Sequence, residues 1–433
     1  MALTGDQGQS PVRGRILRIL SLLVAGSLLW LAATRVPWRD ELSVAPGAAG
    51  GEGVQVVFEG DLQGDWHADW ALFRFAAGTL ADDSPLRGTL LETALVAGGR
   101  VWTHRQGLAE VNVDDPGAPP EQVTWRASVT WRPGMPSAFR RLEAAPIARA
   151  LGFVLLCVLA IVTRWWRLLA LTGCATAWMT CLRLTFVGLF FNTVLPGSTG
   201  GDLARAYVVI RDHPDRRAGA LVSVIMDRVL GLVAMTLLAS AAVATADERF
   251  AFLLPWTLGA SMALIGGLLV FSHPGLRRLL RVEHLLGKLP QGRRLLDLDS
   301  NIRAVLRSPG GLLVPLVLSL ANHLCATAAV YSLGRAFGAD LSFHDFLCVC
   351  TVANSLSAVP ISPGGLGVGE VLFGSLFELA GSLYMLGVAS SFTYRLVMMA
   401  AGLLGGLALV LPGGGSLMAE LRAGRRAAAA HED

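Results

Sequence analysis

Long apolar runs recur along the chain, separated by shorter polar segments. A membrane-spanning helix needs about 20 consecutive apolar residues to cross the hydrocarbon core of a bilayer. Six stretches are long and apolar enough, at residues 16–34, 147–163, 221–245, 250–271, 312–333 and 386–411. Backbone polar groups in lipid have to be satisfied within the segment, which selects helices. The pattern therefore predicts an all-α polytopic membrane protein with six full spans.

Composition supports this class. The chain has 433 residues, of which 53% are hydrophobic and only 16% charged, whereas soluble domains carry about 25% charged residues. All six cysteines lie in or beside apolar segments, so we expect no disulfide framework. The sequence has no Gly-x-x-x-x-Gly-Lys-Ser/Thr loop for a nucleotide. We expect no cofactor and no nucleic-acid partner.

Residues 36–146 differ from the rest of the chain. They are rich in Gly, Pro, Asp and Trp, and short stretches alternate apolar and polar positions as strands do. We predict strands at 54–58, 89–96 and 123–131. The region reads as a small β-rich extracytoplasmic insertion, with an envelope protein as a possible partner.

One group of residues in this insertion resembles a metal site at first sight. Asp65, His67 and Asp69 would share one face of a strand, with Trp66 and Trp70 on the other. This is the ordinary pattern of an apolar-in, polar-out strand, and one histidine with two carboxylates is weak evidence for a metal. We expect no metal there.

Arginines beside the spans set the orientation, because basic residues favour the cytoplasmic side. Arg13, Arg15 and Arg18 precede the first span, Arg164 and Arg167 mark the end of the second, and Arg422, Arg425 and Arg426 follow the last. Both termini are therefore expected in the cytoplasm of a bacterium, with the spans in its inner membrane.

This orientation divides the chain into four parts. They are a cytoplasmic N-terminus with the first span (1–35), the insertion (36–146), a membrane domain (147–411) and a cytoplasmic tail (412–433). Within the membrane domain, two apolar segments near 168–205 and 346–380 have to return to the side from which they entered. We predict two re-entrant helical hairpins of opposite orientation.

Each predicted hairpin is broken by proline and glycine. The first contains Asn192, Pro196, Gly200, Gly201 and Asp202. The second contains a matching series, which is Asn354, Pro360, Ser362, Gly364, Gly365, Gly367 and Glu370. Irregular backbone at membrane depth is tolerated only where it is buried in protein or lines a wet cavity. Matching interruptions in two halves of opposite orientation indicate an inverted repeat with a site between them.

The chemistry of these breaks suits an anionic headgroup. Helices that begin near Asp202 and Glu370 present unpaired N–H groups and positive dipole ends. Arg205, one turn further on, can add a bidentate phosphate contact. The alternative for Asp202 is that it only caps its helix, which aspartate does well. Glu370 is a poorer cap, and pairing with Arg395 is plausible.

Charges within apolar helices carry information, because each costs ~2.5–3.5 kcal/mol at mid-bilayer. Asp227 and Arg228 are neighbours and point about 100° apart on a helix, so each is expected to pair with another helix. Arg183 and Arg395 are expected to face the interior. A purely structural network of ion pairs is the alternative to a binding site.

At these motifs the sequence resembles the transmembrane flippase-like domain of lysylphosphatidylglycerol synthases. The resemblance rests on Asn192–Arg205, on Asp227-Arg228-Val-Leu-Gly231, on Pro360–Glu370 and on Tyr394-Arg395, and covers roughly residues 150–411 with the first span. Two features depart from the family. It usually has Arg before the final Glu, where this chain has Gly369, and the β-rich insertion is not typical.

The resemblance implies a membrane domain that binds or translocates lipid. Members of the family with two activities add a cytoplasmic aminoacyl-transferase domain, which we expect to be absent here. We therefore expect a flippase-like transporter for an anionic or modified (glyco)lipid rather than an enzyme. Two alternatives remain: an integral membrane enzyme that uses Asp202, Asp227 or Glu370 on a lipid-linked substrate, and a lipid-binding scaffold that recruits envelope partners.

Overall fold

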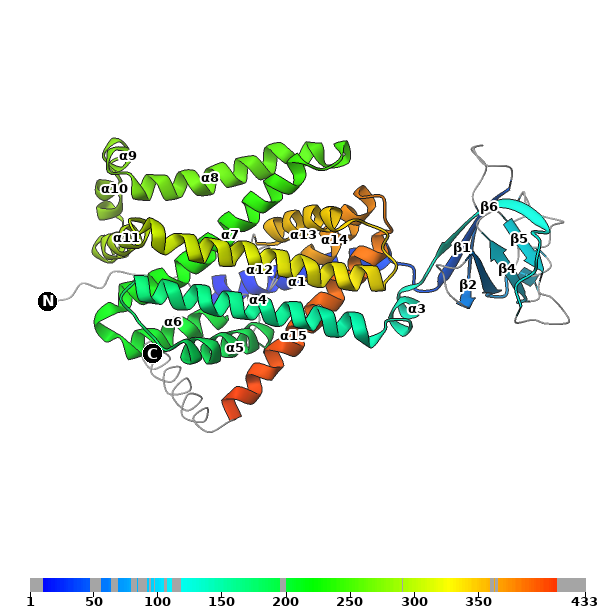
Figure 1. The fold of residues 1–433 in the computed structure, drawn as a ribbon, viewed down its shortest axis with the longest axis horizontal. Coiled ribbons are helices and arrows are strands. Elements are labelled where there is room, and N and C mark those ends of the chain that lie inside the picture. The colour runs from blue at the N-terminus through cyan, green and yellow to red at the C-terminus, as the bar shows by residue number, and fades with distance from the viewer. Residues whose placement is uncertain are drawn as a thin grey trace. The chain divides into compact units, whose positions relative to one another are not determined.

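The computed structural model describes residues 11–46, 56–63, 69–78, 84, 92, 95–96, 98–104, 107–110, 118–194, 200–289, 291–358, 362 and 365–410. The chain divides into two compact units (Figure 1). One is a β unit, Ala33–Glu143, and the other is a helical unit formed by Met1–Ala32 and Ala144–Asp433.

The β unit is a closed antiparallel barrel in the order β1-β2-β3-β4-β5-β6. Its strands are β1 (Asp40–Pro46), β2 (Val56–Gln63), β3 (Trp70–Phe75), β4 (Arg100–His104), β5 (Gly107–Glu110) and β6 (Trp125–Arg132). Strand β1 closes the barrel by pairing with both β2 and β6. Alternate side chains fill the interior, where Leu42, Phe73 and Leu108 are fully buried. The prediction of a β-rich insertion is confirmed.

A buried carboxylate joins the strands to the chain that leaves the barrel. Asp40 is 2% exposed. It accepts the N–H groups of Leu62 and Gly134 at 2.7 Å each and the hydroxyl of Ser137, in the short helix α3 (Met135–Arg140), at 3.1 Å. Three donors satisfy this charge, so Asp40 fixes the register of β1 and the exit of the chain.

The structure corrects one predicted strand of the insertion and describes only part of the Asp65–Asp69 group. The strand predicted at 89–96 is wrong, because the described residues Glu92, Leu95 and Val96 are helical. Leucines at 91 and 95 are four apart, which suits one face of a helix as well as it suits a strand. Asp65 and His67 lie outside the described residues, and Asp69 lies in a bend before β3.

Within the described residues, the helical unit contains five helices that are long and apolar enough to cross a membrane. They are α4 (Ala144–Leu171), α7 (Arg217–Ala244), α8 (Leu254–Ser272), α12 (Pro309–Ala336) and α15 (Tyr384–Val410). Short 3-10 turns, η1 (Pro214–Arg216) and η2 (Glu248–Leu253), precede α7 and α8. The predicted first span lies in α1 (Pro11–Thr34), whose apolar part Leu20–Thr34 is shorter. The chain is a helical membrane protein, and a sixth span at α1 stays a prediction.

Two pairs of shorter helices occupy the predicted hairpins. The first pair is α5 (Trp178–Val194) with α6 (Gly200–Asp212), and the second is α13 (Phe343–Ser357) with α14 (Val368–Leu379). Each pair packs together, and the helix α15 packs against both α5 and α14. In Figure 1 the two pairs lie toward opposite ends of the helical unit.

The segment between α8 and α12 folds into three helices, α9 (Pro274–Leu279), α10 (Val282–Lys288) and α11 (Gly292–Leu306). They gather at the end of the unit where α8 ends and α12 begins (Figure 1). Leu298, Ile302 and Val305 of α11 pack against the core formed by Leu168 and Met226. Helix α11 therefore docks its apolar face on the bundle.

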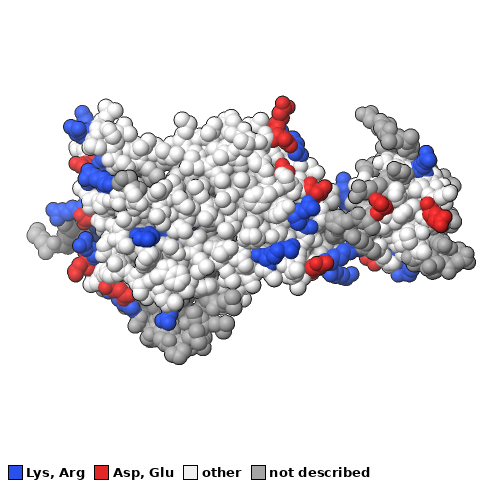
Figure 2. All heavy atoms as spheres, in the orientation of Figure 1, with Lys and Arg blue, Asp and Glu red and all other residues white. Residues whose placement is uncertain are grey.

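The outer surface of the unit is apolar over a wide area. Large side chains stand exposed along α8 and α12, including Trp256 (77%), Met262 (72%) and Leu313 (61%). Figure 2 shows a broad band of this surface with few charged residues. Extended apolar surface is rare on soluble monomers, and here it fits contact with lipid.

Candidate functional site in the two hairpins

Asp202 of the first hairpin forms an ion pair with a spanning helix. It lies in the first turn of α6, and its carboxylate accepts the Arg228 Nε–H at 2.7 Å and a second N–H of the same guanidinium. The Asp202 side chain is 15% exposed, while that of Arg228 is 54% exposed. The pair therefore has one protected partner and one accessible partner.

Arg205 lies behind this pair and is buried. It is 7% exposed, its guanidinium lies 5.3 Å from the centroid of the Trp165 ring, and it donates to the Thr185 carbonyl at 3.4 Å. A terminal nitrogen of Arg205 lies 3.9 Å from a carboxylate oxygen of Asp202, within the range of an ion pair. The sequence predicts a phosphate contact for Arg205, which is buried, whereas the Arg228 side chain reaches the surface.

A second ion pair lies deeper, between α4 and α7. The Arg164 Nε–H donates to Asp227 at 2.6 Å, and another N–H of Arg164 donates to the Ser319 hydroxyl of α12 at 2.9 Å. Both charged side chains are less than 10% exposed. Asp227 and Arg228 therefore pair with different helices, as predicted.

These residues form one electrostatic cluster with an excess of positive charge. Arg205 lies within interaction range of Asp202, Asp227, Arg164 and Arg228. The cluster holds three guanidinium groups against two carboxylates, and it spans α4, α6 and α7. We call it the first-hairpin cluster. Its surplus of one positive charge favours an anion at the exposed member, Arg228.

Close backbone packing holds the two helices of the first hairpin together. A Cβ on Gly201 would lie 2.2 Å from the Gly188 carbonyl oxygen, and one on Gly188 would lie 2.8 Å from the Arg205 Nε. The Asn192 side chain accepts the Gly201 N–H at 2.9 Å. One of the helix-terminal donors expected to be unpaired is therefore already satisfied by Asn192.

The second hairpin carries its own acid–arginine pair. Glu370 is 2% exposed and accepts the Arg395 Nε–H at 3.0 Å with one oxygen. The other oxygen accepts the Gly367 N–H at 2.8 Å, which caps the first turn of α14. The pairing of Glu370 with Arg395 expected from the sequence is present, and the same carboxylate also caps its helix.

Glycines allow this tight turn to form. Gly365 and Gly367 have φ of +70° and +80°, values that favour glycine. A Cβ on Gly367 would also lie 2.7 Å from the side chain of Leu28, so this turn packs closely on α1. Buried Ser362 donates to the Leu366 carbonyl at 2.8 Å and completes the turn.

The remaining predicted site residues fall into three groups. Arg183 is exposed on α5, so its expected interior position is wrong; the helix turns Cys181, Leu184 and Val187 inward instead. Gly200 begins α6, and Asn354 is half-buried near the end of α13. Pro196, Pro360 and Gly364 lie outside the described residues.

Sequence reasoning missed the partner of Asp227. The sequence places Arg164 at the end of a span, whereas α4 continues to Leu171 and Arg164 is buried within it. The signal was available in principle, because an arginine followed by Trp165 and Trp166 in an apolar run needs a buried partner. The sequence does not say which helix supplies that partner.

The described residues offer no group of three or more His, Cys, Asp or Glu side chains that could hold a metal ion. All six cysteines are free, and five are buried. Outside the spans, burial raises the pKa of the Cys174 thiol, which keeps it protonated and unreactive. The described polar side chains of these hairpins form ion pairs and hydrogen bonds.

A family profile described as "Lysylphosphatidylglycerol synthase TM region" matches residues 127–406. The match includes both hairpins, the helices α4, α7, α8 and α12, and most of α15 and of strand β6. Comparison with curated proteins gave no match. Since the matched region makes up well over half of the chain, the protein belongs to the family of the lysylphosphatidylglycerol synthase transmembrane region.

Proposed function

We propose that the protein binds the headgroup of an anionic or modified lipid at the first-hairpin cluster and moves it across the inner membrane. The observation that carries this proposal is the Asp202–Arg228 pair, in which a half-exposed guanidinium is held by a largely buried carboxylate. A phosphate can take over the exposed N–H groups of Arg228 without unfolding anything around them.

The energetics support a functional role for the cluster. Ionisable residues within spanning segments are costly and commonly mark substrate pathways. Arg164 and Asp227 neutralise each other's charge in an ion pair, and the guanidinium of Arg205 lies over the ring of Trp165. Arg228 is the member of the cluster whose charge remains accessible. An anionic headgroup bound there would neutralise the surplus positive charge of the cluster.

The connectivity of the helices supports alternating access. Three helices that are long enough to span, α7, α8 and α12, separate the first hairpin from the second. If each crosses the membrane, the two hairpins open to opposite sides. Such an inverted arrangement of irregular segments is typical of secondary transporters. Here helix α15 packs on both hairpins and so connects them.

The basic segment α9–α11 supports a cytoplasmic location for the end of the bundle that carries it. The first hairpin then opens toward the cytoplasm and the second toward the outside. This places both chain termini in the cytoplasm and the barrel outside it. We include this orientation in the proposal.

Reconstitution into vesicles tests the proposal. Phosphatidylglycerol, a second lipid with a sugar-phosphate headgroup and phosphatidylcholine are each labelled on the headgroup with a fluorophore that a membrane-impermeant reductant quenches. We expect the protein to speed the quenching of inner-leaflet label for one of the two anionic lipids and to leave phosphatidylcholine unchanged. Mass spectrometry of the recovered lipid shows whether it has been altered.

Arg228→Ala should reduce the translocation rate by at least about tenfold, because one charged hydrogen-bonding group is worth about 1.5–3 kcal/mol. Arg217→Ala is the matched control, since Arg217 is exposed at the start of the same helix and outside the cluster. Equal rates for wild type and Arg228→Ala would contradict the headgroup role. Chemical change of the lipid without movement would favour the enzyme alternative.

A further inference from the structure

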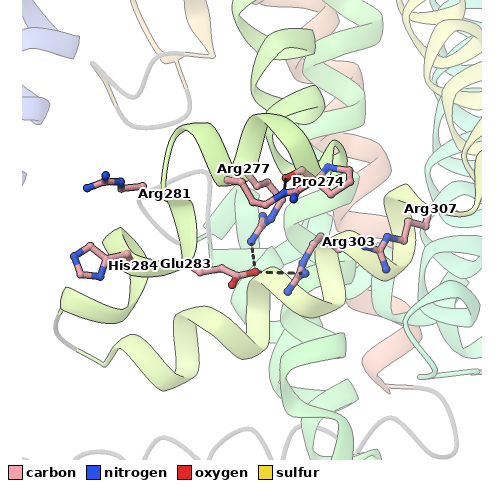
Figure 3. A pocket seen from close by; sticks show the side chains of 8 residues that line it. Pro274, Arg277, Arg281, Glu283, His284, Arg303 and Arg307 are labelled. Carbon is pink, nitrogen blue, oxygen red and sulfur yellow. Dashed lines mark hydrogen bonds and ion pairs between the residues drawn. The ribbon is translucent and has the colours of Figure 1, made fainter.

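A basic pocket lies outside both hairpins, in the segment that joins α8 to α12. It has a volume of about 470 Å³, within the range of about 300–1,000 Å³ that is typical of small-molecule sites. Its lining residues are Pro274, Arg277, Arg278, Arg281, Glu283, His284, Arg303 and Arg307 (Figure 3). Five of these eight residues are arginines, so we call it the arginine pocket.

Two carboxylates hold part of this pocket in place. Asp299, which is 2% exposed on α11, accepts two N–H groups of Arg277 at 2.7 Å each and lies 3.2 Å from Arg303. Glu283 lies 3.5 Å from Arg277 and 3.8 Å from Arg303, and Figure 3 shows these three side chains converging. Asp299 raises the pKa of Arg277, so this guanidinium stays charged. The wall of the pocket is thus prearranged rather than fluctuating.

Positive charge remains after these contacts. Five arginine charges face two carboxylates, which leaves an excess of three. Among the residues that the structure describes, neither Arg281 nor Arg307 takes part in an ion pair. Figure 3 shows Arg281 and Arg307 on opposite sides of the Glu283 contact. Each of these guanidinium groups can bind the oxygens of a phosphate group through paired hydrogen bonds.

The position of the pocket selects a lipid as the source of that phosphate. The candidate span before it ends at Ser272 and the one after it begins at Gly310, so the pocket lies at the level where both helices leave the membrane. Leucines of α9, α10 and the adjoining residues are also exposed: Leu279 (77%), Leu280 (46%), Leu285 (58%) and Leu289 (51%). A segment that combines exposed leucines with arginines lies naturally at the interface, with leucines in the acyl region and arginines at headgroup depth.

We propose that the arginine pocket binds the phosphate of an anionic membrane lipid, as a site separate from the hairpins. The pocket attracts the phosphodiester through its excess of positive charge, to which Arg281 and Arg307 each contribute a guanidinium group, while Arg277 and Arg303 supply a fixed positive wall. Basic pockets at the ends of spanning helices bind anionic headgroups in the same way. This site does not depend on translocation by the hairpins.

Native mass spectrometry of the full chain in nonionic detergent tests this assignment. The protein is freed of lipid and titrated separately with phosphatidylglycerol, phosphatidylcholine and glycerol phosphate, and bound molecules are counted at each concentration. Wild type should retain phosphatidylglycerol at lower concentrations than either of the other two ligands. Arg281→Gln/Arg307→Gln should lose one bound phosphatidylglycerol, with an apparent affinity at least about tenfold weaker at that site.

The matched control is Arg293→Gln/Arg294→Gln. It removes the same charge from the same segment, and both residues are exposed on α11 outside the pocket lining. This control should retain the lipid like wild type, and Arg281→Lys/Arg307→Lys should recover part of the binding. Size-exclusion profiles and Tm values show that each variant is folded.

Three results would overturn the assignment. Equal loss in both glutamine variants would mean that only net charge matters. Equal binding of glycerol phosphate would make the ligand a soluble phosphate ester, and equal binding of phosphatidylcholine would remove the anionic preference. Arg228→Ala should leave the pocket lipid in place, so failure of the hairpin proposal would be visible separately.

Discussion

The two hairpins share a sequence pattern, yet the structure equips them differently. In the first, Asp202 and Arg228 belong to a cluster of five charges that links three helices and has one exposed guanidinium. In the second, Glu370 and Arg395 form a neutral pair, and the carboxylate is also used to cap α14. The same kind of acid–arginine pair therefore stands in two different electrostatic settings.

From this difference we infer that the first hairpin serves ligand binding and the second serves stability. The exposed Arg228 can exchange its partner for a ligand, so the first hairpin is suited to binding. Glu370 is 2% exposed and has both oxygens engaged, so the second hairpin is suited to holding the Gly365–Gly367 turn on α1. Variants of the first hairpin's surface pair should therefore change transport more than stability, and variants of the second should do the reverse.

The largest expected effect lies at the base of the first-hairpin cluster. Asp227→Ala leaves Arg164 buried without its carboxylate, and loss of one member of a buried ion pair costs about 3–5 kcal/mol. We expect a marked fall in the Tm of the detergent-solubilised protein. Asp212→Ala is the control, because Asp212 pairs with Arg211 at the surface and such pairs are worth about 0–1 kcal/mol. Similar Tm values for the two variants would show that the buried pair does not hold the cluster.

Gly201→Ala should have the next largest effect. The added methyl group would lie 2.2 Å from a backbone carbonyl oxygen of Gly188, so the two helices have to move apart. Overpacking of this kind costs about 1–3 kcal/mol. We expect a lower Tm together with slower translocation, since the added Cβ would also lie 2.8 Å from the Asn192 oxygen that accepts the N–H of residue 201 and would distort that bond. An unchanged Tm would mean that α5 and α6 are free to separate.

How far the sequence predicts these two hairpins depends on the kind of information required. Gly/Pro breaks in apolar segments are local signals, and a pair of short helices lies at each predicted hairpin. The partner of Glu370 was also predicted, because a buried acid at the start of a helix needs a cation. Burial cost alone is enough for that inference.

Partners and facing directions are a different matter, because they depend on how helices rotate against one another. Arg183 and Arg164 both lie in apolar runs, yet Arg183 is exposed and Arg164 is buried beside Asp227. The strands of the barrel show the same limit of prediction. Its strand β6 shows clear alternation, whereas β5 has only four residues and is defined by pairing with β4 and β6. Pairing between distant segments carries no mark in a single sequence.

Two variants, one in each hairpin, test directly whether the first hairpin serves transport and the second serves stability. Glu370→Gln keeps an oxygen for the Gly367 N–H but removes the carboxylate charge that Arg395 contacts, so we expect a loss of about 1–3 kcal/mol in unfolding free energy. Asp202→Asn should cost less than about 1 kcal/mol, because its partner is half exposed.

Translocation should show the opposite order. Asp202→Asn removes the competitor that displaces a phosphate from Arg228, so headgroup release and the measured rate should fall severalfold. Glu370→Gln, measured well below its own Tm, should keep more of the wild-type rate, with Glu378→Gln on the same helix as its control. If both variants lose stability and rate in equal proportion, the two hairpins work as one unit and the contrast between them is wrong.

The smallest expected effect sharpens the contrast between the glycines. A Cβ on Gly369 would lie 3.3 Å from a terminal nitrogen of Arg395, the end of a flexible side chain that can move by a few tenths of an ångström. Alanine also improves helix propensity by up to about 1 kcal/mol, which offsets the contact. Gly369→Ala should therefore change the Tm and the translocation rate only slightly, unlike Gly201→Ala, where backbone meets backbone. A large loss at Gly369 would show that Arg395 is fixed as rigidly as the first-hairpin cluster, and the second hairpin would then share its role in binding.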